Sequence, residues 1–163
     1  MRALIEEYGE YIYHLAYLYV KDKQIAEEIT QDVFYMYSVK KEQFRGDASV
    51  KTYLTRIVIN KSHDELRKIK RRQMLQAVLP FKLNERSAEQ EVMKKHQGSS
   101  LKEIVWGLPV HYREIIILHY YEDFSVKEIT ELLKISENTV RTRLRRGREL
   151  LKQELKEEAG GVN

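Results

Sequence analysis

Apolar side chains recur at helical spacing along most of the chain and predict a series of amphipathic helices. Within residues 3–20, Leu4, Tyr8, Ile12 and Leu15 follow the three- and four-residue steps that place side chains on one helix face. No useful run of alternating apolar and polar residues occurs, so the pattern favours an all-α protein. The same spacing predicts further helices over residues 25–39, 50–72, 101–107, 110–121 and 126–133, and a last one that begins after residue 136.

The helical pattern weakens in the middle of the chain. Pro80 interrupts the periodicity, and the polar stretch that follows it ends in Gly98 and two serines. Segments of this composition typically act as flexible linkers. The sequence therefore predicts two small helical domains, residues 1–72 and 101–157, joined by a flexible linker at residues 73–100.

A helix-turn-helix pattern begins at Ser125 in the second domain. Ser125 can cap the first helix, and Glu128, three residues later, completes a capping box. Lys134 and Ile135 fill a short turn, after which Ser136 can cap the second helix. The C-terminal domain is therefore predicted to be a helix-turn-helix domain.

The second helix of this motif separates apolar from polar side chains. Val140, Leu144, Gly147 and Leu151 fall on one face, and an arginine-rich face lies opposite. A recognition helix in the DNA major groove needs this arrangement, because its N-terminal side chains reach base edges while arginines contact guanines or phosphates. A solvated basic helix is the simpler alternative, but it does not explain the capped helices, the short turn and the segregated arginines together. The predicted contacts with duplex DNA are Asn138, Thr139, Arg141, Thr142, Arg145 and Arg146.

A turn followed by a long, increasingly basic helix closes the first domain. Gly46 marks the turn, and either Asp47 or Ser49 can cap the helix. Cationic and amide side chains beside Phe44 and Tyr53 suit single-stranded nucleic acid, which needs charge for its backbone and rings for its unstacked bases. A surface helix with Tyr53 in the core is an equally good interpretation, and the residues by themselves do not decide. The polar stripe consists of Thr52, Arg56, Asn60, His63 and Arg67.

Acidic and polar residues gather on the outer side of the second predicted helix. Glu27, Glu28, Gln31 and Tyr35 lie opposite its apolar stripe, and Asp32 lies at the boundary. A solvated acidic surface and a protein-docking surface both fit this pattern. Nothing in the helix itself separates the two.

Charge is unevenly distributed along the chain. The 163 residues are 42% hydrophobic and 33% charged, with a net charge of +4. Residues 61–72 and 136–152 each contain six Lys or Arg against two acidic residues, so the remainder of the chain is net acidic. Two basic helices with an acidic remainder suggest two contacts with one polyanion and a different partner elsewhere.

The sequence carries no cysteine, which excludes disulfides and thiolate metal sites. No apolar run approaches the ~20 residues that a membrane span requires. The N-terminal stretch lacks the apolar region and the cleavage site of a signal peptide. We therefore expect a cytoplasmic protein that does not insert into a membrane.

No group of residues has the pattern of an active site. The five histidines are scattered, and none pairs with a carboxylate at metal-ligand spacing. Neither a phosphate-cradling glycine-rich loop nor a nucleophile elbow occurs. We therefore expect no enzymatic activity, no cofactor and no metal site.

Three stretches, in this order along the chain, resemble segments of one protein family. AEEITQDVF at residues 26–34 resembles its acidic helix, and FRGDASVKTYLTRIVINKSHDELRKIKRR at residues 44–72 resembles its segment that engages the promoter −10 element. Residues 108–151 resemble its domain that binds the −35 element. The family is the bacterial extracytoplasmic-function sigma factors of the sigma-70 type, the minimal promoter-specificity subunits of RNA polymerase.

The resemblance implies roles for particular residues and partners. The outer side of the acidic helix would dock core RNA polymerase, the basic helix would capture flipped −10 bases, and the helix-turn-helix would read the −35 duplex. An anti-sigma factor, commonly a membrane-bound one, holds many members inactive. The implied polymerase contacts are Glu27, Glu28, Gln31 and Asp32, and the implied −10 contacts are Arg45, Gly46, Asp47, Ser49, Lys51, Thr52, Tyr53, Arg56 and Asn60.

Three residues depart from the usual pattern of the family. Tyr53 stands where tryptophan is common, Arg145 where histidine is common, and Gly147 where alanine is common. Tyrosine preserves base stacking with a smaller ring. Glycine in a helix interior costs up to about 1 kcal/mol relative to alanine, unless close packing against a preceding helix requires it. These departures affect the promoter sequence that is recognised rather than the family.

Two other functions fit parts of the sequence. A helix-turn-helix regulator that acts without polymerase would bind a palindromic site as a dimer, but it gives no purpose to the helix at 25–39 or to the segment at 44–72. A nucleic-acid-processing enzyme would need acidic clusters for metal ions, and the sequence shows none.

Overall fold

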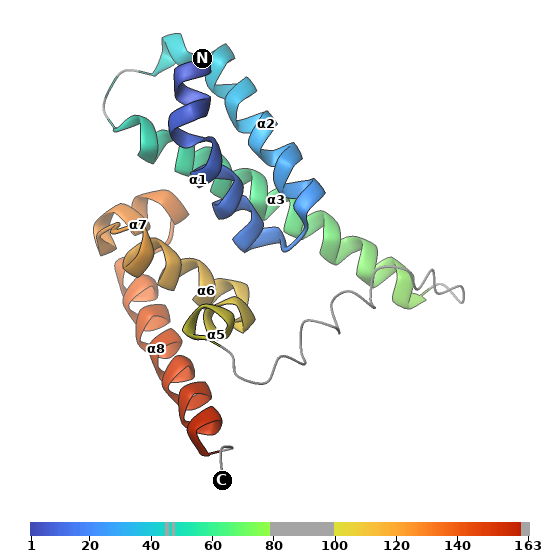
Figure 1. Cartoon of the computed structure of the whole chain (residues 1–163), viewed down its shortest axis with the longest axis vertical. Coiled ribbons are helices and arrows are strands. Elements are labelled where there is room, and N and C mark those ends of the chain that lie inside the picture. Colours follow the sequence, from blue (N-terminus) through green and yellow to red (C-terminus); the bar gives the residue numbers. More distant parts are fainter. Residues whose placement is uncertain (45, 47, 79–99, 161–163) are drawn as a thin grey trace. The chain divides into compact units, whose positions relative to one another are not determined.

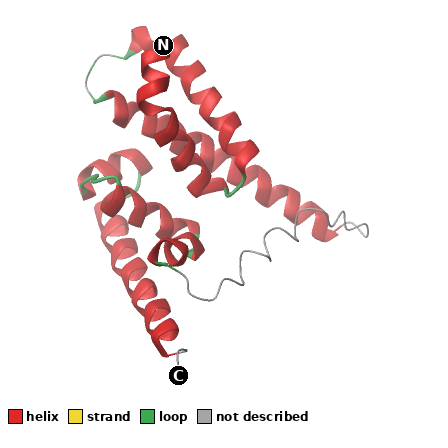
Figure 2. Cartoon of the chain, in the orientation of Figure 1, coloured by secondary structure: helices red, strands yellow, loops and turns green. Residues whose placement is uncertain are grey.

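The described part of this computed structural model comprises residues 1–44, 46, 48–78 and 100–160. Within those residues all regular structure is helical and no strand occurs (Figure 2). The chain divides into two compact units, Met1–Gln73 and Met74–Asn163. The predicted all-α fold of two helical domains is therefore confirmed, whereas most of the predicted linker lies outside the described residues.

The first unit begins with a helical hairpin made by α1 (Arg2–Val20) and α2 (Lys23–Lys40), which lie side by side in Figure 1. Lys21 ends α1 in the left-handed conformation, with φ of 54°. Asp22 then caps α2, since its carboxylate accepts a hydrogen bond from the Ile25 N–H at 3.0 Å. This two-residue connection makes the helices antiparallel and neighbouring.

The core of the first unit is formed by apolar side chains from three helices. Each of these helices buries the face that its apolar spacing predicts, and burial of such side chains is the main term that stabilises the unit. The fully or almost fully buried members are Ile12, Leu15 and Ala16 of α1, Ile29 and Val33 of α2, and Leu54, Val58 and Ile59 of α3.

The third helix, α3 (Val50–Val78), follows the short 3-10 helix η1 (Lys41–Gln43). Ser49 caps it, because the Thr52 N–H donates to Ser49 Oγ at 3.1 Å. Asp47, the other predicted cap, lies outside the described residues. The helix continues past its predicted end at residue 72, because the segment that follows contains good helix formers and no breaker before Pro80.

Over residues 100–160, the second unit contains four helices and one π-helical turn. Capping boxes start α5 and α7: the Glu128 N–H donates to Ser125 Oγ at 3.1 Å, and the Ser125 N–H donates to Glu128 Oε2 at 2.7 Å. The box predicted at Ser125 is therefore confirmed, together with the helix-turn-helix. The elements are α5 (Leu101–Gly107), α6 (Val110–Ile116), the π-helix η3 (Ile117–Tyr121), α7 (Val126–Leu133) and α8 (Glu137–Gly160).

The core of the second unit is organised around α6, which packs against α8. Its buried Arg113 donates from Nη1 to the carbonyl oxygens of Leu108 at 2.9 Å and Trp106 at 3.3 Å. These bonds supply partners for carbonyl groups at the C-terminal end of α5, which have no partner within the helix. The predicted single helix over 110–121 changes to π-helical geometry at Ile117. The buried apolar side chains include Ile115, Ile116, Leu118, Ile129, Leu132, Val140 and Leu144.

Gly147 lies where α8 packs closely against α6. A Cβ atom at Gly147 would lie 3.2 Å from both Cγ1 and Cδ1 of the buried Ile116, and 3.7 Å from Cβ of Tyr112. Close packing against a preceding helix, the condition under which glycine is useful here, is therefore present.

We expect Gly147→Ala to leave the free energy of unfolding of the second unit almost unchanged. The gain in helix propensity, up to about 1 kcal/mol, is offset because the new methyl group forces Ile116 to move. Gly9→Ala in α1 is the matched control, since its Cβ would meet Ile5 Cγ2 at an ordinary 3.7 Å and should gain most of the propensity term.

Urea unfolding measures the free energy of unfolding of both variants and of the wild type. The fluorescence of the single tryptophan, Trp106 in α5, follows the second unit, and far-ultraviolet circular dichroism follows both. An equal gain in stability at Gly9 and Gly147 would contradict the close approach of α8 to α6.

Candidate nucleic-acid and protein interfaces

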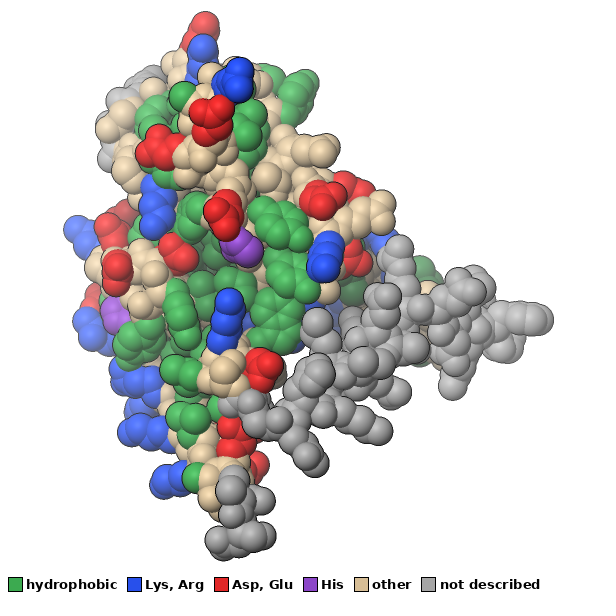
Figure 3. Space-filling model, viewed as in Figure 1, with side chains coloured by type: hydrophobic (Ala, Val, Ile, Leu, Met, Phe, Trp, Pro, Cys, Tyr) green, Lys and Arg blue, Asp and Glu red, His purple; other side chains and the backbone are tan. Residues whose placement is uncertain are grey.

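The predicted −35 residues lie on the solvent side of α8. Asn138, Arg141, Arg145 and Arg146 are exposed, and Thr139 and Thr142 are half-buried. The opposite face of α8, with Val140, Leu144 and Gly147, is buried against the unit. Lys and Arg side chains follow this helix along one edge of the space-filling view (Figure 3). The structure therefore brings all six predicted residues onto one accessible side of a single helix.

Local contacts orient two of these side chains at the start of α8. The Thr139 N–H donates to Ser136 Oγ at 3.1 Å, which caps the helix as predicted, and the Thr139 hydroxyl shares a 2.8 Å hydrogen bond with the Ser136 hydroxyl. Arg141 donates from Nε at 3.0 Å and from Nη2 at 2.7 Å to Glu137 Oε1, one helical turn earlier. Such an exposed pair adds little stability. It does hold the guanidinium of Arg141 to one side of the helix, away from Asn138 and Thr142.

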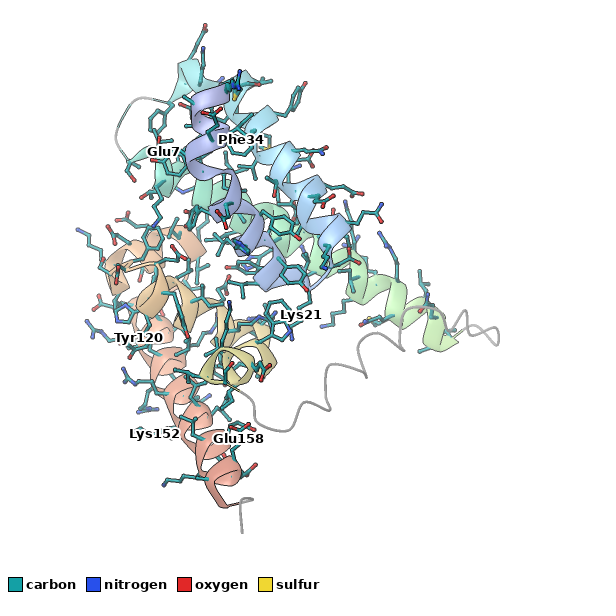
Figure 4. All side chains as sticks on the ribbon, in the orientation of Figure 1. Glu7, Lys21, Phe34, Tyr120, Lys152 and Glu158 are labelled. Carbon is teal, nitrogen blue, oxygen red and sulfur yellow. The ribbon has the colours of Figure 1, made fainter. Side chains whose placement is uncertain are left out.

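Arg148 is a further candidate contact that the sequence pattern did not single out. Its Nη1 donates to the hydroxyl of Tyr120 in η3 at 2.9 Å, so an element outside the helix-turn-helix positions an arginine of α8. Tyr120 lies beside α8 in Figure 4. The dense basic run of the sequence includes Arg148, but only the fold reveals its partner.

The predicted −10 residues that the structure describes lie just before α3 or in its first three turns. Lys51 places its Nζ 4.8 Å from the centroid of the Tyr11 ring. Thr55 is fully buried, and its hydroxyl donates to the Lys51 carbonyl oxygen at 2.7 Å and accepts from the Tyr11 hydroxyl at 2.7 Å. A side chain of α1 therefore fixes both the backbone and the ammonium group of Lys51.

Tyr53 belongs to a cluster of aromatic rings. Its centroid lies 5.0 Å from that of Phe44 and 6.1 Å from that of Tyr37, in tilted and edge-on arrangements. The side chain is half-buried, so Tyr53 is neither a fully buried core residue nor a ring that is fully free to stack on a base. The cluster holds the ring in place while part of it stays accessible.

The other −10 candidates lie around this cluster. Ser49 and Thr52 share a hydroxyl hydrogen bond of 2.9 Å, Arg56 is half-buried and Asn60 is exposed further along α3. Gly46 has φ of 74°, so this turn uses a left-handed conformation that favours glycine. Arg45 and Asp47 lie outside the described residues.

The predicted polymerase residues form a continuous exposed surface on α2. Glu27, Glu28, Gln31 and Asp32 are all exposed, and the Asp32 carboxylate accepts from Lys61 Nζ of α3 at 3.4 Å. Tyr35, one turn beyond Gln31, is 69% exposed, and Val39, one turn further, is 62% exposed. An acidic surface that continues into exposed apolar side chains is more typical of a protein contact than of a purely solvated face.

The described residues show neither a metal-binding cluster nor a transmembrane helix. No group of three or more His, Asp or Glu side chains among them could hold a metal ion. None of the helices in the described ranges is both long and apolar enough to span a lipid bilayer.

Two family descriptions match the chain. Sigma-70 region 2 matches residues 4–72, and Sigma-70, region 4 matches residues 97–151. These segments contain the α2 and α3 surfaces and the α8 surface, respectively.

Curated proteins and solved structures are similar over nearly the whole chain. The ECF RNA polymerase sigma factor SigW of Bacillus subtilis is 30% identical over 94% of this chain and 88% of its own length. The RNA polymerase sigma factor SigV of the same organism is 31% identical over 94% of this chain and 90% of its own length. The sigma factor RpoE, solved in complex with the anti-sigma factor NepR from Bartonella quintana, shares the fold with a TM-score of 0.70 at 21% identity. That alignment covers 96% of this chain and 98% of the solved one.

Proposed function

This chain belongs to the extracytoplasmic-function sigma factors of the sigma-70 family, and on that premise we propose how its surfaces divide the work of transcription initiation. As an alternative sigma factor it directs promoter-specific transcription by RNA polymerase. The proposal that separate surfaces recognise the −10 and −35 elements rests on one observation. The chain has two candidate nucleic-acid surfaces with different chemistry. One combines aromatic rings with cations on α3, and the other is an arginine-rich recognition helix.

The second unit reads the duplex −35 element. α8 enters the major groove, where Asn138, Thr142 and Arg145 face base edges near the start of the helix. Thr139, Arg141 and Arg146 lie beside them and contact the backbone or neighbouring bases. These contacts place polymerase on the promoter.

The first unit recognises and holds the melted −10 element. The half-buried ring of Tyr53 stacks on an unpaired base, while Lys51, Arg56 and Asn60 contact the strand around it. Base flipping costs a few kcal/mol of lost stacking. Stacking on an aromatic side chain returns about 1–3 kcal/mol per base, which is enough to offset that cost.

The outer surface of α2 docks core RNA polymerase in the cytoplasm. Its acidic residues attract a basic polymerase surface, and the exposed Tyr35 and Val39 add apolar area next to them. An anti-sigma factor that covers these surfaces would hold the chain inactive. The chain itself supplies no catalytic step, because it selects and opens the promoter for polymerase.

Charge reversal on α2 tests the docking surface. We expect Glu28→Lys to weaken binding of the full chain to core polymerase by about 1 kcal/mol, roughly fivefold, with a smaller loss at high salt. Fluorescence anisotropy of the labelled chain measures this affinity. Glu42→Lys, a charge reversal at another exposed glutamate outside α2, is the control and should bind as the wild type does. Equal losses for both variants would point to a non-specific charge effect.

In vitro transcription tests the proposal as a whole. Core polymerase with the purified chain should produce transcripts from a random promoter library that share one −35 and one −10 motif, whereas core polymerase by itself should not. A chain that binds polymerase but enriches no promoter motif would contradict the proposed division of work.

A further inference from the structure

A shallow pocket opens on one flank of α8, between this helix and the start of α6. Its volume is about 400 Å³. Two arginines and a histidine are among its lining residues, and no aspartate or glutamate is among those described. The pocket is lined by His111 and Tyr112 from α6 and by Asn138, Thr139, Thr142, Arg143 and Arg146 from α8.

The close approach of α8 to α6 brings these residues together. Gly147 lies against Ile116 and Tyr112, and the missing side chain lets the two helix backbones come near each other. Arg143 lies one turn before Gly147 on α8, and His111 directly precedes Tyr112 on α6. The packing of α8 against α6 therefore brings His111 and Arg143 to the same pocket.

The pocket offers hydrogen-bond donors and positive charge, and this combination selects an oxyanion. A guanidinium presents a rigid fork of N–H groups that matches two oxygens of a phosphate. An imidazole N–H and threonine hydroxyls can donate to the remaining oxygens. A concave, positively charged wall without carboxylates raises the local potential further.

The position of the pocket indicates which phosphate it would receive. A major groove about 12 Å wide admits one helix of about the same diameter, so the flanks of that helix face the phosphates at the two groove rims. Asn138 and Thr142, which are proposed to read bases, are also among the residues that line the pocket. When they face base edges, the pocket faces the backbone of one strand.

We propose that this pocket binds one backbone phosphate of the −35 duplex, with His111 and Arg143 as ligands in addition to the contacts predicted from the sequence. The inference rests on the proposed reading of −35 DNA by α8. The phosphate would set the depth and the angle of α8 in the groove, because α6 and α8 hold it together. His111 would thus extend the DNA interface beyond the helix-turn-helix to an element that precedes it.

The other flank of α8 provides an internal control. There Arg148 is bonded to Tyr120 of η3, and neither residue lines the pocket. Any phosphate that Arg148 contacts lies on the other side of the helix. His111 and Arg143 should therefore be energetically coupled to each other, whereas Arg148 should be independent of both.

Methylphosphonate scanning tests the proposal with the full chain and a duplex that the chain itself selects from random sequence. Each backbone phosphate is replaced in turn by a neutral methylphosphonate, and binding is measured by fluorescence anisotropy. We expect one position on one strand where the substitution weakens the wild type several-fold but has no further effect on His111→Ala or Arg143→Gln. Arg148→Gln should keep the full effect at that position.

Affinities of the variants give a second readout. Each of His111→Ala and Arg143→Gln should weaken binding about threefold to tenfold, by the same factor for every −35 sequence. Arg143→Gln should also reduce the slope of log K against log salt by about 1. His111→Ala combined with Arg143→Gln should reduce DNA affinity by less than the product of the two single fold-losses. His111→Ala combined with Arg148→Gln should reduce it by the full product.

Three results would overturn the proposal. The first is a scan in which no phosphate loses its effect in the His111 and Arg143 variants. The second is a loss confined to particular base pairs, which would make these residues base readers. The third is that millimolar inorganic diphosphate weakens DNA binding by the wild type but not by the variants. That result would mean that the pocket binds a free anion rather than a DNA phosphate. Failure of the wild type to select any duplex would instead count against the proposed −35 function itself.

Discussion

Replacing Tyr53 with alanine should weaken the binding of polymerase with this sigma factor to melted −10 DNA by about 1–3 kcal/mol. That range is the worth of stacking one base on an aromatic side chain. The expectation follows from the half-buried ring, which Phe44 and Tyr37 hold at centroid distances of 5.0 and 6.1 Å. A ring held in this way loses little entropy when a base stacks on it. Tyr53→Trp keeps the stacking surface and should bind at least as well as the wild type.

Fork-junction promoters separate stacking from other effects. Their −10 strand is already single, so binding does not include the cost of melting. Tyr37→Ala removes a ring from the same cluster and is the matched control, because it disturbs Tyr53 without removing its ring. Tyr53→Ala should weaken fork binding much more than Tyr37→Ala, and should leave −35 duplex binding unchanged. Equal losses would mean that the cluster acts only by stabilising the fold.

Replacing Arg145 with alanine should remove about 1–3 kcal/mol of discrimination at one base pair of the −35 element. Arg145 is exposed on the side of α8 that also carries Asn138 and Thr142, where a guanidinium can reach a guanine through two hydrogen bonds. Arg145→Lys should recover only part of the discrimination, since an ammonium group lacks the fork geometry. The other base pairs should keep their preferences.

Competition binding against all single-base variants of the selected −35 duplex measures this discrimination. Lys152→Ala, which also removes an exposed charge from α8 but lies further from its N-terminus, is the control. It should weaken all duplexes alike and only slightly. If Arg145→Ala weakened every duplex by one common factor, Arg145 would contact only phosphate.

Helix bounds could be predicted from the sequence where two independent local patterns agreed. α7 has the predicted bounds, Val126–Leu133, because a capping box at Ser125 and an amphipathic pattern agree on them. The extent of α3 was underestimated, since the weakened apolar periodicity after Arg72 suggested a linker although residues 73–78 include good helix formers. Apolar periodicity and helix propensity are separate properties, and the helix continues up to Val78 without a regular apolar face.

Features that depend on tertiary packing could not be predicted. The π-helical turn at Ile117–Tyr121 is too short for its periodicity to differ visibly from that of an α-helix. Arg148 meets Tyr120, and His111 shares a pocket with Arg143, only because α6, η3 and α8 pack together. For Tyr53, two interpretations were equal from the sequence, and the structure combines parts of both.

The last turns of α3 have a consequence for how far the chain can reach. Residues 70–78 are all exposed, and Met74 and Val78 are 63% and 82% exposed, so no core stabilises this end of the helix. Helical turns without packing are only marginally stable in water. A residue spans 1.5 Å along a helix but about 3.3–3.6 Å when extended, so unwinding residues 73–78 lengthens the tether between the two units by roughly 10 Å. That length corresponds to about three base-pair steps of 3.4 Å, so fraying of α3 would let one protein span promoters with different spacers.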